Sequence, residues 1–155
     1  MNGACIAGIF IAREARGTMT SLPAVTAIAG RGLEGDRYFN KQGTFWKDHP
    51  DFQLTLIEEE AIAALKRDYG IALAAGNARR NLVTRGVALN HLVGREFTVG
   101  PVRIRGLRLC EPCSHLEKMC ELRVIKGLRH RGGLRAEILE GGHIQVGDVL
   151  QSLPG

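Results

Sequence analysis

The sequence has few aromatic residues: five Phe, two Tyr and one Trp in a chain of 155 residues. The core must therefore be mainly aliphatic. Proteins that hold single-stranded nucleic acid usually stack its bases on aromatic rings, so this shortage disfavours nucleic acid as a partner. The sequence also lacks any apolar run of about 18 residues, the length of a membrane span, and we expect no membrane association.

Other absences narrow the class of protein further. The first residues, "MNGACIAGIFIAREARG", have no basic leader before a short apolar run, so we interpret them as a strand rather than a signal peptide. We expect a cytoplasmic protein whose four cysteines stay reduced, without disulfides. No repeat, linker or low-complexity segment interrupts the chain, and its length suits one domain over residues 1–155.

What the sequence does have is a regular supply of glycine and of short strand-like runs. Twenty glycines are spread along the chain, which suits many short strands joined by tight turns. The strand-like runs are residues 4–12, 23–29, 52–58, 81–84, 95–100, 102–109, 134–139 and 143–151. We predict a mainly β protein, a mainly antiparallel β-barrel or sandwich with helices at its rim.

One segment has the period of a helix. In "EEEAIAALKRDYG" (58–70), Ala61, Ile62, Leu65 and Tyr69 fall on one face, acidic residues fill the first turn, and Gly70 ends the segment. We predict one main helix here and one or two short helices within 114–129.

Three cysteines lie close together in "GLRLCEPCSHLEKMCELR" (106–123). A zinc site would need Cys110 and Cys113 plus two ligands from Cys120, His115 or His130, and the second C-x-x-C pair usual in such sites is missing. A thioredoxin-like redox pair would need an alternating βαβ pattern, which this chain does not have.

A single reactive cysteine is the third interpretation, and the one we favour. Cys113 follows Pro112 at a predicted strand-to-helix junction, where unpaired backbone N–H groups and arginines lower the pKa of a thiol. Cys110 ends a strand and is better explained as a small buried hydrophobe.

Two arginine-containing stretches are candidates for binding an anion, as the formal net charge of +5 allows. In "GRGLEGDRY" (30–38), Gly35 would let the backbone approach a ligand that Arg37 could bind, although Asp36 could simply cap a turn. In "GNARRNLVTRG" (76–86), strand alternation would place Arg79 and Asn81 on one face and Arg80 on the other, where Arg80 could be solvated, or turn into the site if the strand starts late.

These pieces in this order resemble the MOSC domain family, named for the C-terminal domain of molybdenum cofactor sulfurase. The resemblance runs through "GLEGDRY", "LTLIEEEAIAAL", "RRNLVTRGVALNHLVGREFTVG", "CEPC", "RGGLRAEIL" and "GGHIQVGDVL", and covers about residues 3–150. It implies a closed or near-closed antiparallel β-barrel with one main helix and short helices at the rim.

The resemblance also implies a site. Its central residue is Cys113, which in the family either carries sulfur as a persulfide or ligates the molybdenum of the pterin cofactor. Arg79 and Asn81 match a motif that binds the anionic end of that cofactor, and the loop near the same pocket matches Gly35, Asp36 and Arg37. This chain has Tyr38 where the family often has histidine, which weakens any role for an imidazole there.

We therefore predict a MOSC protein that binds molybdenum cofactor and uses Cys113 as metal ligand or sulfur carrier. The chain shows neither the N-terminal barrel domain of the amidoxime reducers nor a desulfurase domain, and no lysine site for pyridoxal phosphate was identified. A separate desulfurase or electron-transfer protein would thus be its partner, with reduction of N-hydroxylated substrates as one activity. The alternatives are a non-catalytic anion-binding module and a zinc site at the C-x-x-C.

Overall fold

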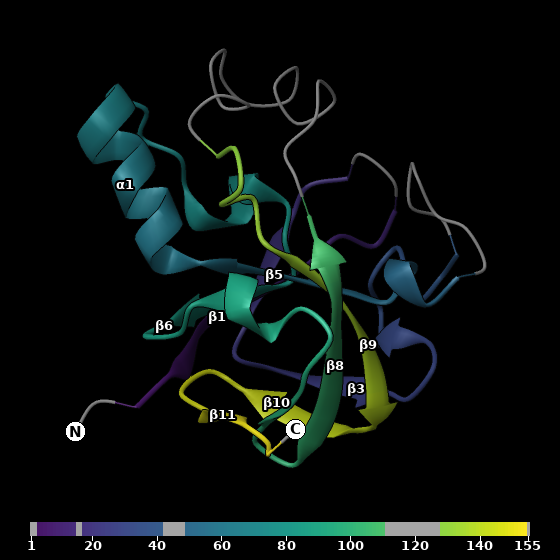
Figure 1. The fold of residues 1–155 in the computed structure, drawn as a ribbon. Helices are drawn as coiled ribbons and strands as arrows, with labels where there is room; N and C mark the ends of the chain where they lie inside the picture. The colour runs from purple at the N-terminus through teal and green to yellow at the C-terminus, as the bar shows by residue number, and fades with distance from the viewer. Residues whose placement is uncertain (1–2, 15–16, 42–48, 111–127, 155) are drawn as a thin grey trace.

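In the described part of the chain, the fold consists of two β-sheets with one α-helix against the outside of the larger sheet (Figure 1). The computed structural model describes residues 3–14, 17–41, 49–110 and 128–154. The strands are β1 (Cys5–Ile11), β2 (Thr20–Leu22), β3 (Ala24–Ile28), β4 (Gly32–Leu33), β5 (Leu54–Glu58), β6 (Leu82–Arg85), β7 (Glu96–Val99), β8 (Val102–Leu109), β9 (Leu134–Glu140), β10 (Gly142–Gln145) and β11 (Leu150–Ser152). The helix is α1 (Glu59–Tyr69), and the 3-10 helices are η1 (Pro50–Phe52), η2 (Ala75–Ala78) and η3 (Leu89–Leu92).

The larger sheet has eight strands in the order β11-β7-β8-β9-β5-β6-β1-β2, and the smaller has three in the order β10-β3-β4. Strand pairs within the described ranges are antiparallel, apart from the parallel pair β5–β6. The mainly antiparallel β fold is therefore confirmed.

The sheets are not closed into a barrel, so the predicted closed or near-closed barrel is not confirmed. The larger sheet ends at β11 and β2. One isolated bridge, between Cys5 and Val149, joins β1 to the residues just before β11. Backbone hydrogen bonds from Ile6 N to Asp148 O (2.9 Å) and from Gly147 N to Ile6 O (2.8 Å) flank this bridge. The contact is too short to form a strand ladder.

The main core lies between the two sheets and is almost wholly aliphatic, as the shortage of aromatic residues requires. Its fully buried members include Ile9, Leu56 and Leu82 of the larger sheet, Ile144 of the smaller one, and one aromatic residue, Phe97. Alternate residues of β9 and of the first part of β8 point into this core and the others point outward.

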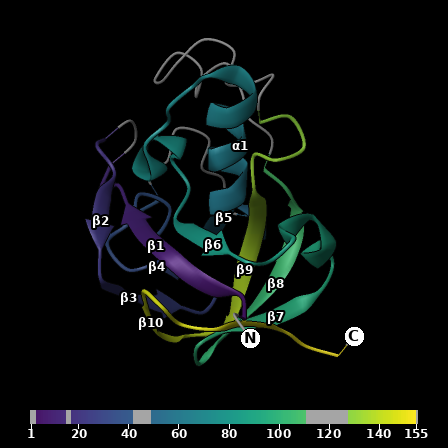
Figure 2. The ribbon, with the colours of Figure 1, turned by 90° about the vertical axis from the view of Figure 1, so that its left-hand side faces the viewer.

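A second apolar cluster lies beneath α1, which stands over β5 and β6 (Figure 2). Ala61 and Leu65 pack from the helix onto Ile57 and Val83 of those strands. Gly70 ends the helix with φ 68°, and its N–H donates to the carbonyls of Leu65 and Lys66. The predicted helix and its stop are thus confirmed.

Two features of the sheets differ from the sequence prediction. The short strands β2 and β4 were not predicted, and β4 lies in the glycine-rich stretch 30–38. The run 143–151 is two strands rather than one, because a turn with Gly147 at φ 96° separates β10 from β11. The helices predicted within 114–129 fall almost wholly outside the described residues. Over the ranges described, no helix is both long and apolar enough to span a membrane.

Candidate functional site

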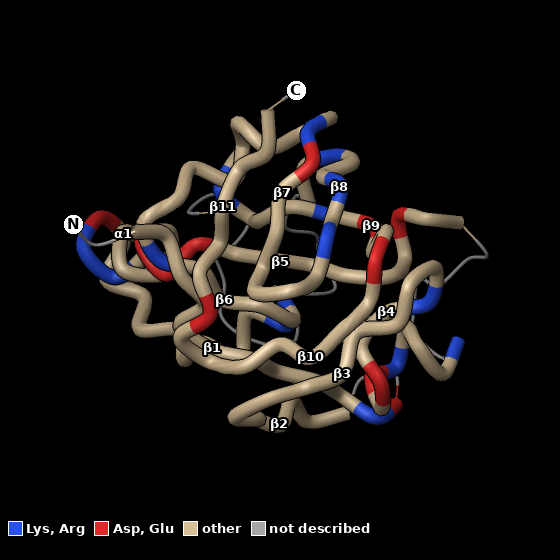
Figure 3. The backbone as a smooth tube through the Cα atoms, turned by 90° about the horizontal axis from the view of Figure 1, so that it is seen from below, with Lys and Arg blue, Asp and Glu red and all other residues tan. Residues whose placement is uncertain are grey.

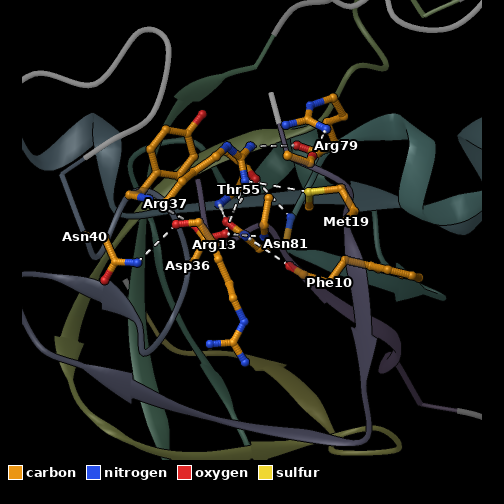
Figure 4. Close-up of polar contacts among 12 residues, drawn as sticks. Phe10, Arg13, Met19, Asp36, Arg37, Asn40, Thr55, Arg79 and Asn81 are labelled. Carbon is orange, nitrogen blue, oxygen red and sulfur yellow. Dashed lines mark hydrogen bonds and ion pairs between the residues drawn. The ribbon is translucent and has the colours of Figure 1, made fainter. Parts of the chain in front are cut away.

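The Gly35–Arg37 turn follows β4 and is fixed to the body of the protein by a buried carboxylate (Figure 4). Asp36 has no exposed surface; its Oδ1 accepts from Ala12 N (3.0 Å) and its Oδ2 from Tyr38 N (3.2 Å). Oδ1 also pairs with Arg37 Nη1 at 3.1 Å. Gly35 has φ 88°, a conformation that favours glycine. Asp36 thus caps a turn, as the plainer interpretation predicted.

The side chain of Arg37 is also buried, and 5% of the surface of the residue is exposed. Besides Asp36, its guanidinium donates from Nη2 to Arg79 O (3.3 Å) and contacts Met19 Sδ from Nη1 at 3.7 Å. Its Cζ lies 4.5 Å from the centre of the Tyr38 ring. Arg37 therefore joins the turn to the start of β6, and its charge is already balanced by a carboxylate.

Arg79 and Asn81 do not share a strand face, so that part of the prediction was wrong. Arg79 precedes β6 at the end of η2 and has φ 59°, in the left-handed region, where strand alternation does not apply. Its Nη1 donates to Gly17 O at 2.8 Å. The turn of η2, "AGNA", and the left-handed Arg79 come before the strand, which begins only at Leu82.

Asn81 is fully buried and acts as a clamp between three strands (Figure 4). Its Oδ1 accepts from Thr55 N (3.1 Å) and Thr55 Oγ1 (3.2 Å), and its Nδ2 donates to Phe10 O at 3.1 Å. The backbone N–H of Asn81 returns a bond to Thr55 Oγ1 at 3.0 Å. The side chain therefore joins β1, β5 and the start of β6, and it holds Arg79 and Arg80 in place through the backbone.

Arg80, which the sequence placed on the opposite face, lies against the end of β8. Its Nη2 donates to Cys110 O (3.1 Å) and its Nε to Gly132 O (2.8 Å). Cys110 is buried, with 2% of its surface exposed, and its N–H donates to Gly133 O at 2.7 Å. Arg80 thus joins two parts of the backbone: Cys110, which follows β8, and Gly132, which precedes β9.

Arg135 of β9 reaches the same region from another side, and sequence reasoning missed it. Its Cζ lies 5.1 Å from the centre of the Phe52 ring, and its Nη1 donates to Asp51 O at 3.2 Å. Burial works against the charged form, but nearby Cys110, Tyr38 and Asp51 favour it more strongly, and the pKa of Arg135 is raised. In sequence, "LRAEIL" gives no signal for this role, because Arg135 occupies an ordinary outward position of a strand.

Two arginines of β8, Arg103 and Arg105, are neutralised by acidic residues on neighbouring strands. Figure 3 shows blue bands on β8 beside red bands on β9. Arg103 pairs with Glu96 (2.9 Å) and Glu140 (3.1 Å), and Arg105 pairs with Glu96 (3.2 Å) and Glu137 (3.2 Å). These exposed pairs contribute little stability, but they remove Arg103 and Arg105 from the set of cations available to a ligand.

The predicted central residue, Cys113, lies outside the described residues, and so do His115 and Cys120. Its role therefore stays a prediction. Within the described part of the chain, no group of three His, Cys, Asp or Glu side chains could hold a metal ion. Of the zinc ligands considered above, only Cys110 and His130 belong to that part.

Comparison with known proteins places this fold. A family model described as the MOSC domain matches residues 44–151. The crystal structure of the YuaD protein from Bacillus subtilis is similar with a TM-score of 0.80 and 14% identity, over 97% of this chain and 96% of that one. Structures of YiiM from Geobacillus stearothermophilus and from Escherichia coli give TM-scores of 0.76 and 0.70 at 17% and 16% identity. They cover 97% of this chain in both cases, and 75% and 70% of their own. No curated protein sequence matches the chain.

Proposed function

This chain belongs to the MOSC domain family, and we propose that it binds molybdenum cofactor at the arginine-lined end of β8, beside Cys110. The observation that supports the proposal is that Arg80 binds the backbone carbonyl of Cys110 and Arg135 lies opposite Arg108 at the same end of β8. Neither guanidinium has a carboxylate within ion-pair distance among the described residues. A half-buried cation without such a partner is costly, and an anionic ligand offsets that cost.

The residues around β8 fit the anionic end of a pterin cofactor. A phosphate group needs N–H donors in a fixed arrangement, and the planar guanidinium supplies them in pairs. Arg79 and Arg80 would hold that end. Asp36, Arg37 and Asn81 would support them rather than touch the ligand, since their hydrogen bonds are made within the fold. When bound, the cofactor would supply the two-electron chemistry of molybdenum.

Cys113 would provide the reactive sulfur, three residues along the chain from Cys110. A thiolate can ligate a soft metal or attack sulfane sulfur, because both uses need a deprotonated sulfur. As a metal ligand, it would serve a reductase of N-hydroxylated substrates whose electrons come from another protein. As a carrier, its thiolate would attack the sulfane sulfur of a desulfurase persulfide, form a new S–S bond, and release the donor thiolate.

Elemental analysis tests the proposal on protein made in a host that synthesises the cofactor. We expect molybdenum and pterin in wild-type protein and in C110S, and a loss of at least about tenfold in C113S if Cys113 ligates the metal. Sulfur released by cyanide from wild type but not from C113S would instead support the carrier. If C113S keeps full molybdenum and full releasable sulfur, Cys113 has neither role.

Two other functions give different results in the same analysis. A non-catalytic anion-binding module would retain pterin in C113S and show no turnover. A zinc site at the C-x-x-C would give stoichiometric zinc without molybdenum. We favour cofactor binding over zinc because guanidinium groups, which cannot ligate a metal, gather at this point and suit an anion.

A further inference from the structure

An excess of positive charge lies on the outer face of β8 and β9, beneath η1. Arg108 and Arg135 are direct cross-strand partners in this antiparallel pair, so their side chains share a face. Like charges placed opposite each other repel. Asp51 relieves only part of this, since its carboxylate forms an ion pair with Arg108, whereas it stabilises the charge of Arg135 without an ion pair and binds Arg135 through its backbone carbonyl.

Cys110 directly follows β8, two residues beyond Arg108, whose cross-strand partner is Arg135. The cysteine is buried and its backbone is held by Gly133 on one side and Arg80 on the other. Arg80, which precedes β6, therefore binds the backbone of Cys110, while Arg135 of β9 lies on the outer face opposite Arg108.

Arg135 is held in a fixed position rather than swinging in solvent. The Phe52 ring packs against its guanidinium at 5.1 Å, and Asp51 O binds Nη1. The Tyr38 hydroxyl interacts with it too. A guanidinium has no acceptor, so in any hydrogen bond between these two groups the tyrosine oxygen would accept and its O–H would remain a donor. The ring of Tyr38 is itself fixed, against Phe52 at 6.5 Å and Arg37 at 4.5 Å.

We propose that Arg135 and Tyr38, which contact the same Phe52 ring, form an oxyanion subsite at the end of β8 that binds a carboxylate or phosphate group of the substrate. The subsite is separate from the anionic end of the cofactor, which Arg79 and Arg80 hold from the η2 side. Its assignment to a substrate rests on the proposed function; the anion binding itself does not.

The subsite would make the protein selective for anionic substrates. A positively charged site that binds a carboxylate rejects the neutral analogue, because the cation is then left without its partner. Asp36 and Asp51, which contact Tyr38 and Arg135 respectively, are already paired through their carboxylates with Arg37 and Arg108. Neither can take the place of the ligand without breaking an existing ion pair.

Titration of inorganic phosphate into protein made without the cofactor tests the subsite directly. We expect R135Q to weaken phosphate binding at least about tenfold and R135K to weaken it several-fold, because lysine keeps the charge but not the fork. R67Q is the matched control: it removes the same charge from an exposed residue on α1 and should bind as wild type. Circular dichroism of each variant verifies the fold, and R135K remains informative if R135Q does not fold.

The same variants made with the cofactor separate the two proposals. Unchanged molybdenum and pterin in R135Q, with weaker phosphate binding, supports a distinct subsite. Loss of both shows that Arg135 holds the cofactor, which overturns the subsite and leaves the proposed function intact. Phosphate binding in R135Q equal to that of wild type, or none in wild type, overturns the subsite as well. Wild-type protein that binds phosphate but never contains molybdenum contradicts the proposed function alone.

Discussion

Replacing Asn81 with alanine should destabilise the protein whether or not a cofactor is present. The change removes the acceptor for Thr55 N and the donor to Phe10 O, both of which are in the interior. A buried backbone group left without a partner costs about 1–3 kcal/mol. Two such groups give a loss of about 2–6 kcal/mol, a large share of the roughly 5–15 kcal/mol that stabilises a domain.

Urea denaturation of cofactor-free protein measures this loss, and T55V provides a control that changes the same cluster. Valine keeps the shape of Thr55 but removes the hydroxyl that accepts from Asn81 N at 3.0 Å. Because the two side chains share hydrogen bonds, the double variant should lose less than the sum of the single losses by about 0.5 kcal/mol or more. If N81A costs under about 1 kcal/mol but abolishes cofactor retention, Asn81 is a ligand-binding residue and not a clamp.

Three further changes test the framework around the site. D36A should cost about 3–5 kcal/mol by urea denaturation, since it leaves a buried guanidinium without its carboxylate. G133A should cost at least about 2 kcal/mol by the same assay, because φ is 115° and an added Cβ would lie 2.0 Å from Leu56 O. The hydrogen bond from Arg85 lowers the pKa of Glu59. The pair therefore contributes its full stability above the pKa that Glu59 has in the unfolded chain. This contribution is lost as the pH falls through the lower pKa that Glu59 has in the folded protein. E59Q should therefore lower stability by under about 1 kcal/mol at pH 7, less at high salt, and by nothing below that folded value; an equal loss at every pH would contradict this account.

The regular elements could be predicted from the sequence because each repeats a simple period. β8 alternates buried and outward residues over its first part, and α1 combines an apolar face with a glycine stop. Such local patterns do not specify how the ends of a sheet meet. The bridge between Cys5 and Val149 depends on backbone atoms far apart in sequence, which is why closure of the barrel could not be predicted.

The candidate site was predicted less well, and Arg79 shows the reason. Strand alternation was applied one turn too early, because nothing in "NARRN" marks where η2 ends and β6 begins. A single residue in the left-handed region was enough to break the expected side-chain alternation. Arg80, assigned to the opposite face, consequently became the residue that meets Cys110.

Whether an arginine at this site can bind an anionic ligand depends on its ion-pair partners and not on how many arginines the sequence contains. Arg37 stands next to Asp36, and that neighbour cancels the charge that made the motif look like an anion site. Arg135 has no ion pair with a carboxylate among the described residues, and the carboxylate of Asp51, whose backbone carbonyl it binds, is held by Arg108. The register of neighbouring strands decides which side chains form ion pairs, and this register cannot be read from the sequence. An arginine in an ordinary strand position can therefore be the cation that a ligand meets, while the arginine in the glycine-rich motif serves the fold.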